Sequence, residues 1–211
     1  MRISISGIET IVYAEDLYLQ INDISGKDLT RIWPQIKADY INYSKWFCFR
    51  NTHIPQDVLD SIGATIEDDC TELRLYSTTA TLPKNIMAEM ITEETFHEFS
   101  IFHDKCAPDV YWTGERIGRD LSRWGIFCIR KNGNIIGYVT ISMWHPTMAE
   151  IFCIQSKDVD ICKELIAAAS KYAFDNGKFD VLHQADNNTV HQAAQALGFV
   201  VKGFYKGYLV Q

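Results

Sequence analysis

The sequence contains no long hydrophobic run and no cluster of basic residues. No apolar stretch approaches the roughly 18 residues that a membrane-spanning helix needs. The N-terminal segment MRISISGIETIVYAEDL has acidic residues where a signal peptide has an apolar run. With 20 Lys and Arg against 27 Asp and Glu, the net charge is −7, and no Lys/Arg run is present that could follow phosphates. We therefore expect a cytoplasmic protein that binds neither nucleic acid nor membrane.

Metal-ligand patterns are also missing. The sequence has no CxxC pair, no HExxH, no H-x-x-x-H and no Cys/His cluster. Its 6 cysteines lie far apart, mostly inside apolar runs such as WFCF, GIFCI and EIFCI. This pattern is typical of buried, reduced thiols and not of zinc ligands or a disulfide framework. We expect no metal.

The chain does have enough apolar residues for a core, at 47% of 211 residues, which suits one large domain or two small ones. FCIRK and IIGYVTISM flank the turn Asn132-Gly133-Asn134, which predicts an antiparallel hairpin. EIFCI, residues 150–154, is predicted to be the next strand. From Asp158 to Asn176 apolar residues recur at helical spacing, so a long amphipathic helix is expected there.

The chain then continues as a strand, a second helix and a last strand. VLHQA, residues 181–185, predicts a strand, and Asn187 stands at the start of a helix that Leu197-Gly198-Phe199 ends. VVKGFYKGYLV follows. Residues 85–90 predict a strand ahead of the hairpin, and two helices are expected at 92–104 and 113–124.

Residues 17–76 repeat part of this series more faintly. Gly63 and Leu75 are separated by the same twelve positions as Gly198 and Val210. Two unrelated α/β segments with similar loop lengths are the alternative explanation. The stretch STTATLPKN, residues 77–85, is the most linker-like in the chain. We therefore predict an N-terminal unit at 1–80 and a second domain at 85–211.

The order of elements over residues 85–211 resembles the GNAT superfamily of N-acetyltransferases. NGNIIGYV is similar to the family's hairpin, and Asn187 lies eleven residues before Gly198, as in the family's N…GF segment. The N-terminal copy resembles the second half of the same fold, as in a tandem GNAT protein with a truncated, degenerate first unit. This resemblance implies an α/β (α+β) fold with a mixed, mostly antiparallel sheet flanked by helices.

The resemblance also implies acetyl-CoA as co-substrate, entering a V-shaped gap between strands 150–154 and 181–185. The family's phosphate loop is Arg or Gln, two residues, Gly, one residue, then Gly or Ala. Lys157, Asp160 and Cys162 occupy these positions, so both glycines are missing. The alternative for Asp158 and Asp160 is that they cap the helix. The implied coenzyme A contacts are Phe152, Cys153, Ile154, Lys157, Val159, Asp160, Ile161, Cys162, Lys163 and Asn187.

The implied acid–base groups are less regular. Glu150 takes the place of the family's base on the strand before the phosphate loop, with solvent exposure as the alternative. The family's tyrosine, four residues before Gly198, is Ala194 here, and Tyr205 is the substitute candidate. His183 and His191 lie near Asn187 in sequence. The implied wall for a cationic amine is Asp109, Tyr111, Trp112 and Glu115.

Three functions are compatible with these residues. The first is an acetyl-CoA-dependent N-acetyltransferase in which a small-molecule or peptide amine attacks the thioester directly. The second is a non-catalytic GNAT-fold binding or regulatory module that has lost the coenzyme A phosphate loop. The third is a structural or dimerising partner that uses the Trp- and Tyr-rich N-terminal half, which includes the possibility of a homodimer.

Overall fold

The computed structural model describes residues 1–210, which fall into two units. Unit 1 consists of Met1–Thr71 together with the C-terminal segment from Gly203, and unit 2 consists of Glu72–Lys202. The C-terminal segment from Gly203 is therefore grouped with unit 1, whereas the sequence analysis placed it in the second domain at 85–211. No helix in residues 1–210 is long and apolar enough to cross a membrane.

Unit 1 is a sheet with two helices on one face. Its elements are β1 (Arg2–Ile5), β2 (Ile8–Tyr13), β3 (Tyr18–Asn22), α1 (Gly26–Asp39), β4 (Ser44–Arg50), α2 (Gln56–Ile62), the first part of β5 (Thr65–Tyr76), up to Thr71, and the part of β11 (Val200–Val210) from Gly203. The strand order is β1-β2-β3-β4-β11-β5. Helix α1 begins where the Ser25 side chain accepts a hydrogen bond from the Asp28 N–H. Its buried residues Leu29, Ile32 and Ile36 recur at helical spacing and join the unit's core.

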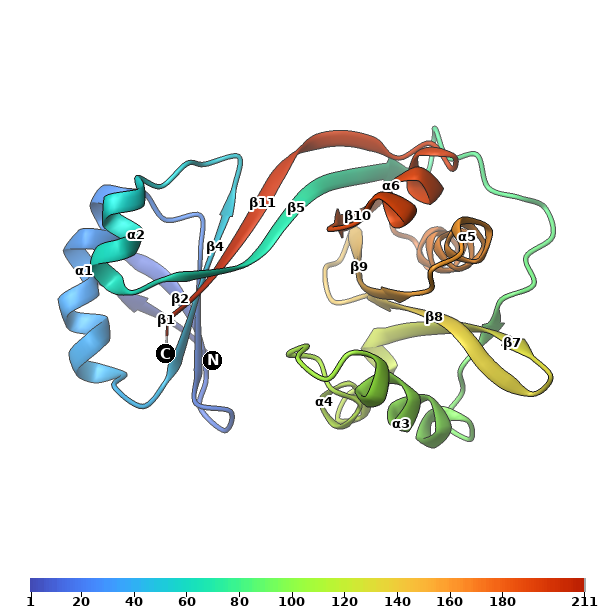
Figure 1. Cartoon of the computed structure of the whole chain (residues 1–211), viewed down its shortest axis with the longest axis horizontal. Helices are drawn as coiled ribbons and strands as arrows, with labels where there is room; N and C mark the ends of the chain where they lie inside the picture. The colour runs from blue at the N-terminus through green and yellow to red at the C-terminus, as the bar shows by residue number, and fades with distance from the viewer. Residues whose placement is uncertain (211) are drawn as a thin grey trace. The chain divides into compact units, whose positions relative to one another are not determined.

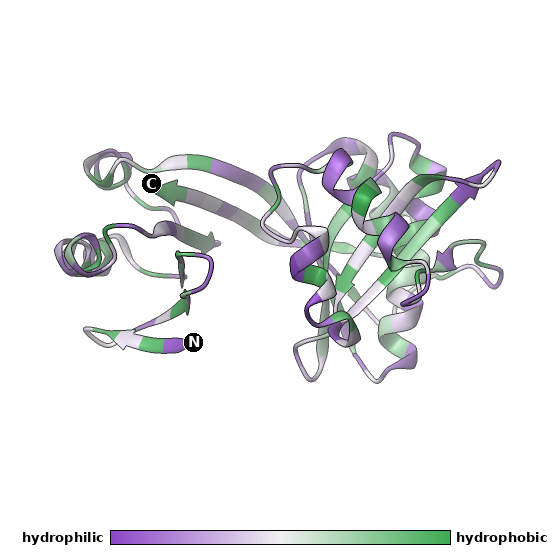
Figure 2. Cartoon of the chain, turned by 90° about the horizontal axis from the view of Figure 1, so that it is seen from below, coloured by the Kyte–Doolittle hydropathy of each residue, from purple (hydrophilic) through white to green (hydrophobic). Residues whose placement is uncertain are grey.

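Unit 2 is a sheet with helices on both faces. Its elements are the second part of β5 from Glu72, β6 (Glu89–Met90), α3 (Phe96–Cys106), α4 (Gly114–Gly118), the 3₁₀ turn η1 (Leu121–Arg123), β7 (Trp124–Lys131), β8 (Asn134–Ser142), β9 (Met148–Gln155), α5 (Val159–Asp175), β10 (Asp180–Ala185), α6 (Asn188–Gln195) and the first residues of β11, up to Lys202. The strand order is β11-β5-β10-β9-β8-β7-β6. Helices α5 and α6 lie on one side of β7–β9, and α3 and α4 lie on the other (Figure 1). Colouring by hydropathy shows polar and apolar residues alternating along the helices (Figure 2). The predicted mixed, mostly antiparallel sheet flanked by helices is confirmed.

The predicted hairpin is formed by β7 and β8. Lys131 pairs with Asn134, and the two residues between them, Asn132 and Gly133, have φ of 53° and 80°. Two successive left-handed residues make the turn whose twist suits a two-residue hairpin. Trp124 is the first residue of β7, and so the predicted helix over 113–124 ends early, at Gly118, and continues only as a 3₁₀ turn.

Gly137 explains the apolar-Gly-apolar pattern that begins β8. A Cβ at this position would lie 2.9 Å from Ile161 Cγ2 and 3.0 Å from the Gln155 carbonyl oxygen. A Cβ this close to both atoms would force Ile161 or the Gln155 backbone to shift, so the missing side chain lets α5 approach β8 closely. The motif is therefore a packing requirement of the helix that follows β9.

The predicted repeat is visible in the order of the elements. The series β3-α1-β4-α2-β5 matches β9-α5-β10-α6-β11, and the first two strands of each series pair in parallel. Gly63 and Gly198 follow the second helix of their series, with φ of 70° and 94°. The last strands are exchanged, because β5 lies next to β10 and β11 lies next to β4. Neither series therefore completes its sheet with its own last strand.

Candidate functional site

Strands β9 and β10 run parallel for four residue pairs and then separate. The pairs extend from Asp180–Met148 to His183–Ile151. Against β8, Ile151 pairs with Ile141 and Cys153 pairs with Thr140, so Phe152 is an extra residue that bends β9. Among residues 1–210, Cys153–Gln155 of β9 pair with β8 and with no residue of β10. The predicted gap between β9 and β10 is therefore confirmed after Phe152. It was wrong for Glu150 and Ile151, which pair with β10.

Glu150 lies in the middle of the sheet. Successive strand pairs place Trp124, Ser142, Glu150 and Leu182 in one row across β7, β8, β9 and β10. Paired residues on neighbouring strands present their side chains to the same face, with Cβ atoms about 5 Å apart. The half-buried Glu150 therefore shares a face with Trp124, the face that α3 and α4 cover. Glu150 therefore does not lie on an edge strand, and its side chain is not fully exposed to solvent.

An aromatic cluster lies on the same face. The Trp112 ring is 5.2 Å from that of Trp124 and 5.6 Å from that of Trp144, and the Phe152 ring is 5.6 Å from Trp124. Trp144 is 47% exposed and Phe152 is 43% exposed. Because Glu150 lies on the same face of the sheet, this face combines a carboxylate with partly exposed aromatic rings. Such a surface suits an ammonium group attached to an apolar body.

The four residues of the predicted amine wall are divided by the structure. Trp112 belongs to the aromatic cluster, and the Tyr111 ring adjoins it at 5.1 Å with the Arg116 guanidinium 4.2 Å from its centre. Asp109 is exposed on the loop. Glu115 is exposed on α4, where it forms an ion pair with Arg119 at 3.1 Å. The structure therefore places Trp112 against Phe152 and Tyr111 against Trp112. Asp109 and Glu115 are exposed to solvent.

A buried polar chain holds the loop of Trp112 against the sheet. His103 Nε2 lies 2.7 Å from the Trp112 carbonyl oxygen, and His103 Nδ1 lies 2.7 Å from the Tyr138 hydroxyl. Because the carbonyl accepts, Nε2 donates, and in the neutral ring Nδ1 accepts from Tyr138. The Tyr138 oxygen is 3.5 Å from Cys153 Sγ. Burial raises the pKa of both Tyr138 and Cys153, so both groups remain protonated and act as positioning groups.

The start of α5 does not have the form of a phosphate loop. The Asp158 carboxylate accepts hydrogen bonds from the N–H groups of Asp160 and Ile161, which confirms Asp158 as a cap. Asp160 is an exposed first-turn residue and not a second cap. Cys162 is buried, and its thiol points to the Ser156 carbonyl oxygen at 3.6 Å. Two of the backbone N–H groups that could bind a phosphate at this helix start are therefore already occupied.

The other residues predicted to contact coenzyme A lie around this helix and the bulge. Lys157 and Val159 are exposed, Ile161 packs toward Gly137, and Ile154 and Lys163 are half-buried. Asn187 caps α6 by accepting a hydrogen bond from the Val190 N–H at 3.0 Å. The amide group of Asn187 also donates to Asp186 at 2.8 Å.

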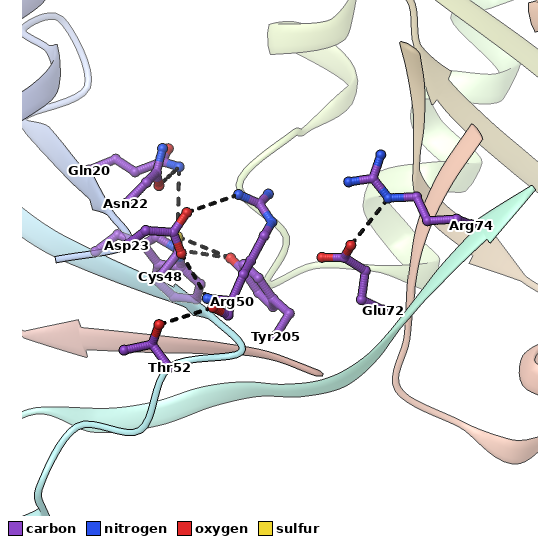
Figure 3. A network of polar contacts seen from close by, with 10 residues as sticks. Gln20, Asn22, Asp23, Cys48, Arg50, Thr52, Glu72, Arg74 and Tyr205 are labelled. Atoms are coloured by element: carbon purple, nitrogen blue, oxygen red, sulfur yellow. Dashed lines mark hydrogen bonds and ion pairs between the residues drawn. The ribbon is translucent and has the colours of Figure 1, made fainter. Parts of the chain in front are cut away.

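Tyr205 belongs to unit 1 and not to the unit that holds Glu150. Its hydroxyl lies 3.3 Å from the Trp46 Nε1 that donates to it, and it donates to Cys48 Sγ at 3.1 Å (Figure 3). Burial raises the pKa of Tyr205 and raises that of Cys48 to about 11. The Tyr205 hydroxyl is therefore already hydrogen-bonded within unit 1, and its role as a general acid stays a prediction.

Trp124 and Trp144 were not anticipated as site residues. Counting back from the Asn132-Gly133 turn brings residue 124 opposite residue 141, which already predicts both tryptophans at the same end of the hairpin. In the structure an extra residue at Ile136 shifts the register by one, so that Trp124 pairs with Ser142. A separate cavity of about 280 Å³ is lined by Glu98, Ile101, Phe102, Lys105, Asn134 and Ile135, and it includes none of the predicted site residues. Residues 1–210 contain no group of three or more metal-ligating side chains.

Comparison with known proteins gives a structural likeness alone, because no family model and no curated protein matches the sequence. A GCN5-related N-acetyltransferase from Kribbella flavida aligns with 99% of this chain and 88% of its own, at 13% identity and a TM-score of 0.76. A tandem GNAT protein from the clavulanic acid biosynthesis pathway aligns with 96% of this chain and 78% of its own, at 11% identity and a TM-score of 0.60.

The Saccharomyces cerevisiae N-myristoyltransferase with bound myristoyl-CoA aligns with 91% of this chain and 59% of its own, at 12% identity and a TM-score of 0.57. Identities this low show shared folds and not shared reactions. The mixed, mostly antiparallel sheet flanked by helices agrees with this likeness. The chain has the fold of the GNAT superfamily of N-acetyltransferases.

Proposed function

We propose that unit 2 transfers an acyl group from a coenzyme A thioester to an amine. The observation that supports this most directly is the end of the β9–β10 ladder at Ile151 and His183, followed by the bulge at Phe152. An extended arm that carries amide groups can pair with backbone N–H and C=O groups left open in this way. The pantetheine arm of coenzyme A is such a group.

The chain suits one part of coenzyme A better than another. The separation of β9 from β10 suits the pantetheine arm. The start of α5 suits the phosphates poorly, because Asp158 occupies two backbone N–H groups and Asp160 adds a second carboxylate. Lys157 is the nearest basic side chain in sequence. We therefore expect pantetheine to supply most of the affinity and the nucleotide to supply little.

Glu150 and the aromatic cluster are proposed to receive the acceptor. The rings of Trp112, Trp144 and Phe152 offer faces to a cationic amine or its apolar body. Glu150 takes the proton that the amine must lose before its nitrogen attacks the thioester carbon. As the C–N bond forms and the C–S bond breaks, the leaving thiolate takes a proton from solvent, because the family's tyrosine position holds the buried Ala194.

Thiol release with acetyl-CoA and a panel of primary amines tests this proposal. Glu150→Gln should lower kcat at neutral pH by at least about a hundredfold, the usual contribution of a general base. Glu94→Gln is the matched control, since Glu94 is exposed and precedes α3. Turnover that survives Glu150→Gln would remove Glu150 from the mechanism.

The alternative is a GNAT-fold module that does not catalyse acyl transfer. The Asp158 cap and Ala194 are the observations that favour it. Thermal unfolding with acetyl-CoA distinguishes the two. Ligand at about 100 times its Kd stabilises a binding protein by about 2.7 kcal/mol. An unchanged melting temperature at millimolar acetyl-CoA would favour the non-catalytic module. A cytoplasmic location and a homodimer remain predictions.

A further inference from the structure

His183 lies at the point where β9 and β10 separate. It forms the last residue pair of the ladder, with Ile151, and its side chain is 5% exposed. Its Nδ1 atom is 3.2 Å from the Ile151 carbonyl oxygen. The imidazole ring is therefore fixed to the neighbouring strand beside the bulge at Phe152.

This contact determines where the ring carries its proton. A carbonyl oxygen accepts hydrogen bonds and cannot donate them, so Nδ1 must hold the hydrogen. A neutral imidazole has one N–H, which leaves Nε2 with a bare lone pair. Burial lowers the pKa of His183 to about 4, so the ring is neutral at physiological pH. Nε2 of His183 is consequently an acceptor and not a donor.

The Nε2 atom is buried and has no hydrogen-bond partner among residues 1–210. An unpaired buried acceptor is unfavourable, and most buried polar atoms in folded proteins are paired. A histidine that served packing alone would gain from replacement by an apolar ring. The unpaired atom lies instead on the strand that borders the open end of the β9–β10 ladder.

We propose that His183 Nε2 accepts a hydrogen bond from an amide N–H of the pantetheine arm of the acyl donor, which makes His183 a positioning residue. The inference rests on the function proposed above. Pantetheine contains two secondary amides, which are neutral N–H donors. The phosphates of coenzyme A have no N–H to give, and a cationic amine would need a charged or solvated partner in place of a buried imidazole.

His183→Asn tests this directly, because an asparagine amide can still donate to the Ile151 carbonyl but lacks an acceptor at the Nε2 position. The exposed His97→Asn on α3 is the matched control. In calorimetric titration, His183→Asn should weaken CoA and pantetheine alike by about tenfold, as expected for one hydrogen bond of average strength. The KM for acetyl-CoA should rise while the KM for the amine stays unchanged. Because the smaller side chain leaves space in the core, a lower melting temperature is expected for either role, and binding is therefore measured well below the unfolding transition.

Nitrogen-15 NMR of the wild-type full chain supplies a second measurement that needs no variant. The His183 Nε2 resonance should report a bare nitrogen in the free protein and move toward the hydrogen-bonded range on addition of pantetheine. Adenosine 3′,5′-bisphosphate should leave it unchanged. If CoA binds but Nε2 does not respond and His183→Asn binds equally well, the inference is overturned and the proposed function stands. If neither CoA nor pantetheine binds at millimolar concentration, both fail.

Discussion

The carboxylate of Asp158 accepts a hydrogen bond from the backbone N–H of Asp160 at 2.8 Å. The same oxygen accepts from the Ile161 N–H at 3.2 Å. A helix N-terminus with free N–H groups attracts anions, whereas one capped by its own carboxylate has these donors satisfied and carries negative charge. The start of α5 therefore has two of its N–H groups satisfied by a side chain of its own and carries a carboxylate there.

Asp158→Ser should raise the affinity for acetyl-CoA severalfold at low salt, because a serine hydroxyl still caps α5 without the charge. Affinity for acetyl-pantetheine, which lacks the nucleotide, should not change. Calorimetric titration of both ligands measures the difference. Asp175→Ser is the matched control, since it removes the same charge from the last turn of α5. An equal gain in both variants would mean that overall charge, and not the cap, limits binding.

Gly137→Ala should destabilise unit 2 by about 1–3 kcal/mol, the usual cost of forcing an extra methyl group into a packed contact. The new Cβ would collide with Ile161 Cγ2 and the Gln155 carbonyl oxygen. Urea unfolding followed by circular dichroism provides the measurement. Ile136→Ala, at the partly exposed neighbouring position on β8, should cost less. If the two substitutions cost the same, close packing of α5 at Gly137 is not what fixes this glycine.

The stability of the protein should fall as the pH drops through the range between the two pKa values of His183. The folded-state pKa is about 4 and the ordinary value is 6.5, so between them the unfolded chain binds a proton that the folded chain does not. The contribution of neutral His183 to the free energy of unfolding is therefore fully present above pH 6.5. At pH 4 the free energy of unfolding is lower by about 3 kcal/mol because of this group. Guanidinium unfolding across this range should show a weaker pH dependence in His183→Asn. Parallel curves for the two proteins would contradict the burial of a neutral imidazole.

Cys106 should be the first thiol to react with a disulfide reagent in the native protein. It is exposed, whereas Cys48, Cys70, Cys128 and Cys162 are buried and Cys153 is half-buried. Burial raises the pKa of the Cys48 thiol to about 11, which leaves almost no reactive thiolate at neutral pH. Cys106→Ser should remove the fast phase of thiol titration. A fast phase that persists in this variant would show that another cysteine is accessible.

The helices and the hairpin of unit 2 could be predicted because the sequence patterns that form them involve only neighbouring residues. The Asn132-Gly133 turn, the apolar spacing of α5 and the cap of Asn187 each depend on a few neighbouring residues. The errors occurred where the signal was ambiguous. Trp124 continues an apolar pattern that suits either a helix end or a strand start, and its pairing with Ser142 in β7 and β8 decided the outcome.

The sequence by itself determined the order of strands and helices from β7 to β11, the hairpin, the helical spacing of α5 and the resemblance to the GNAT fold, because turns and periodicity act between near neighbours. The tertiary structure alone decided which strands pair. It placed the end of β11 beside β4, and with it Tyr205 in unit 1. It also ended the β9–β10 ladder at Ile151 and His183 and left Nε2 of His183 unpaired. Strand pairing and the desolvation of a side chain depend on residues far apart in the chain, so no local pattern encodes them.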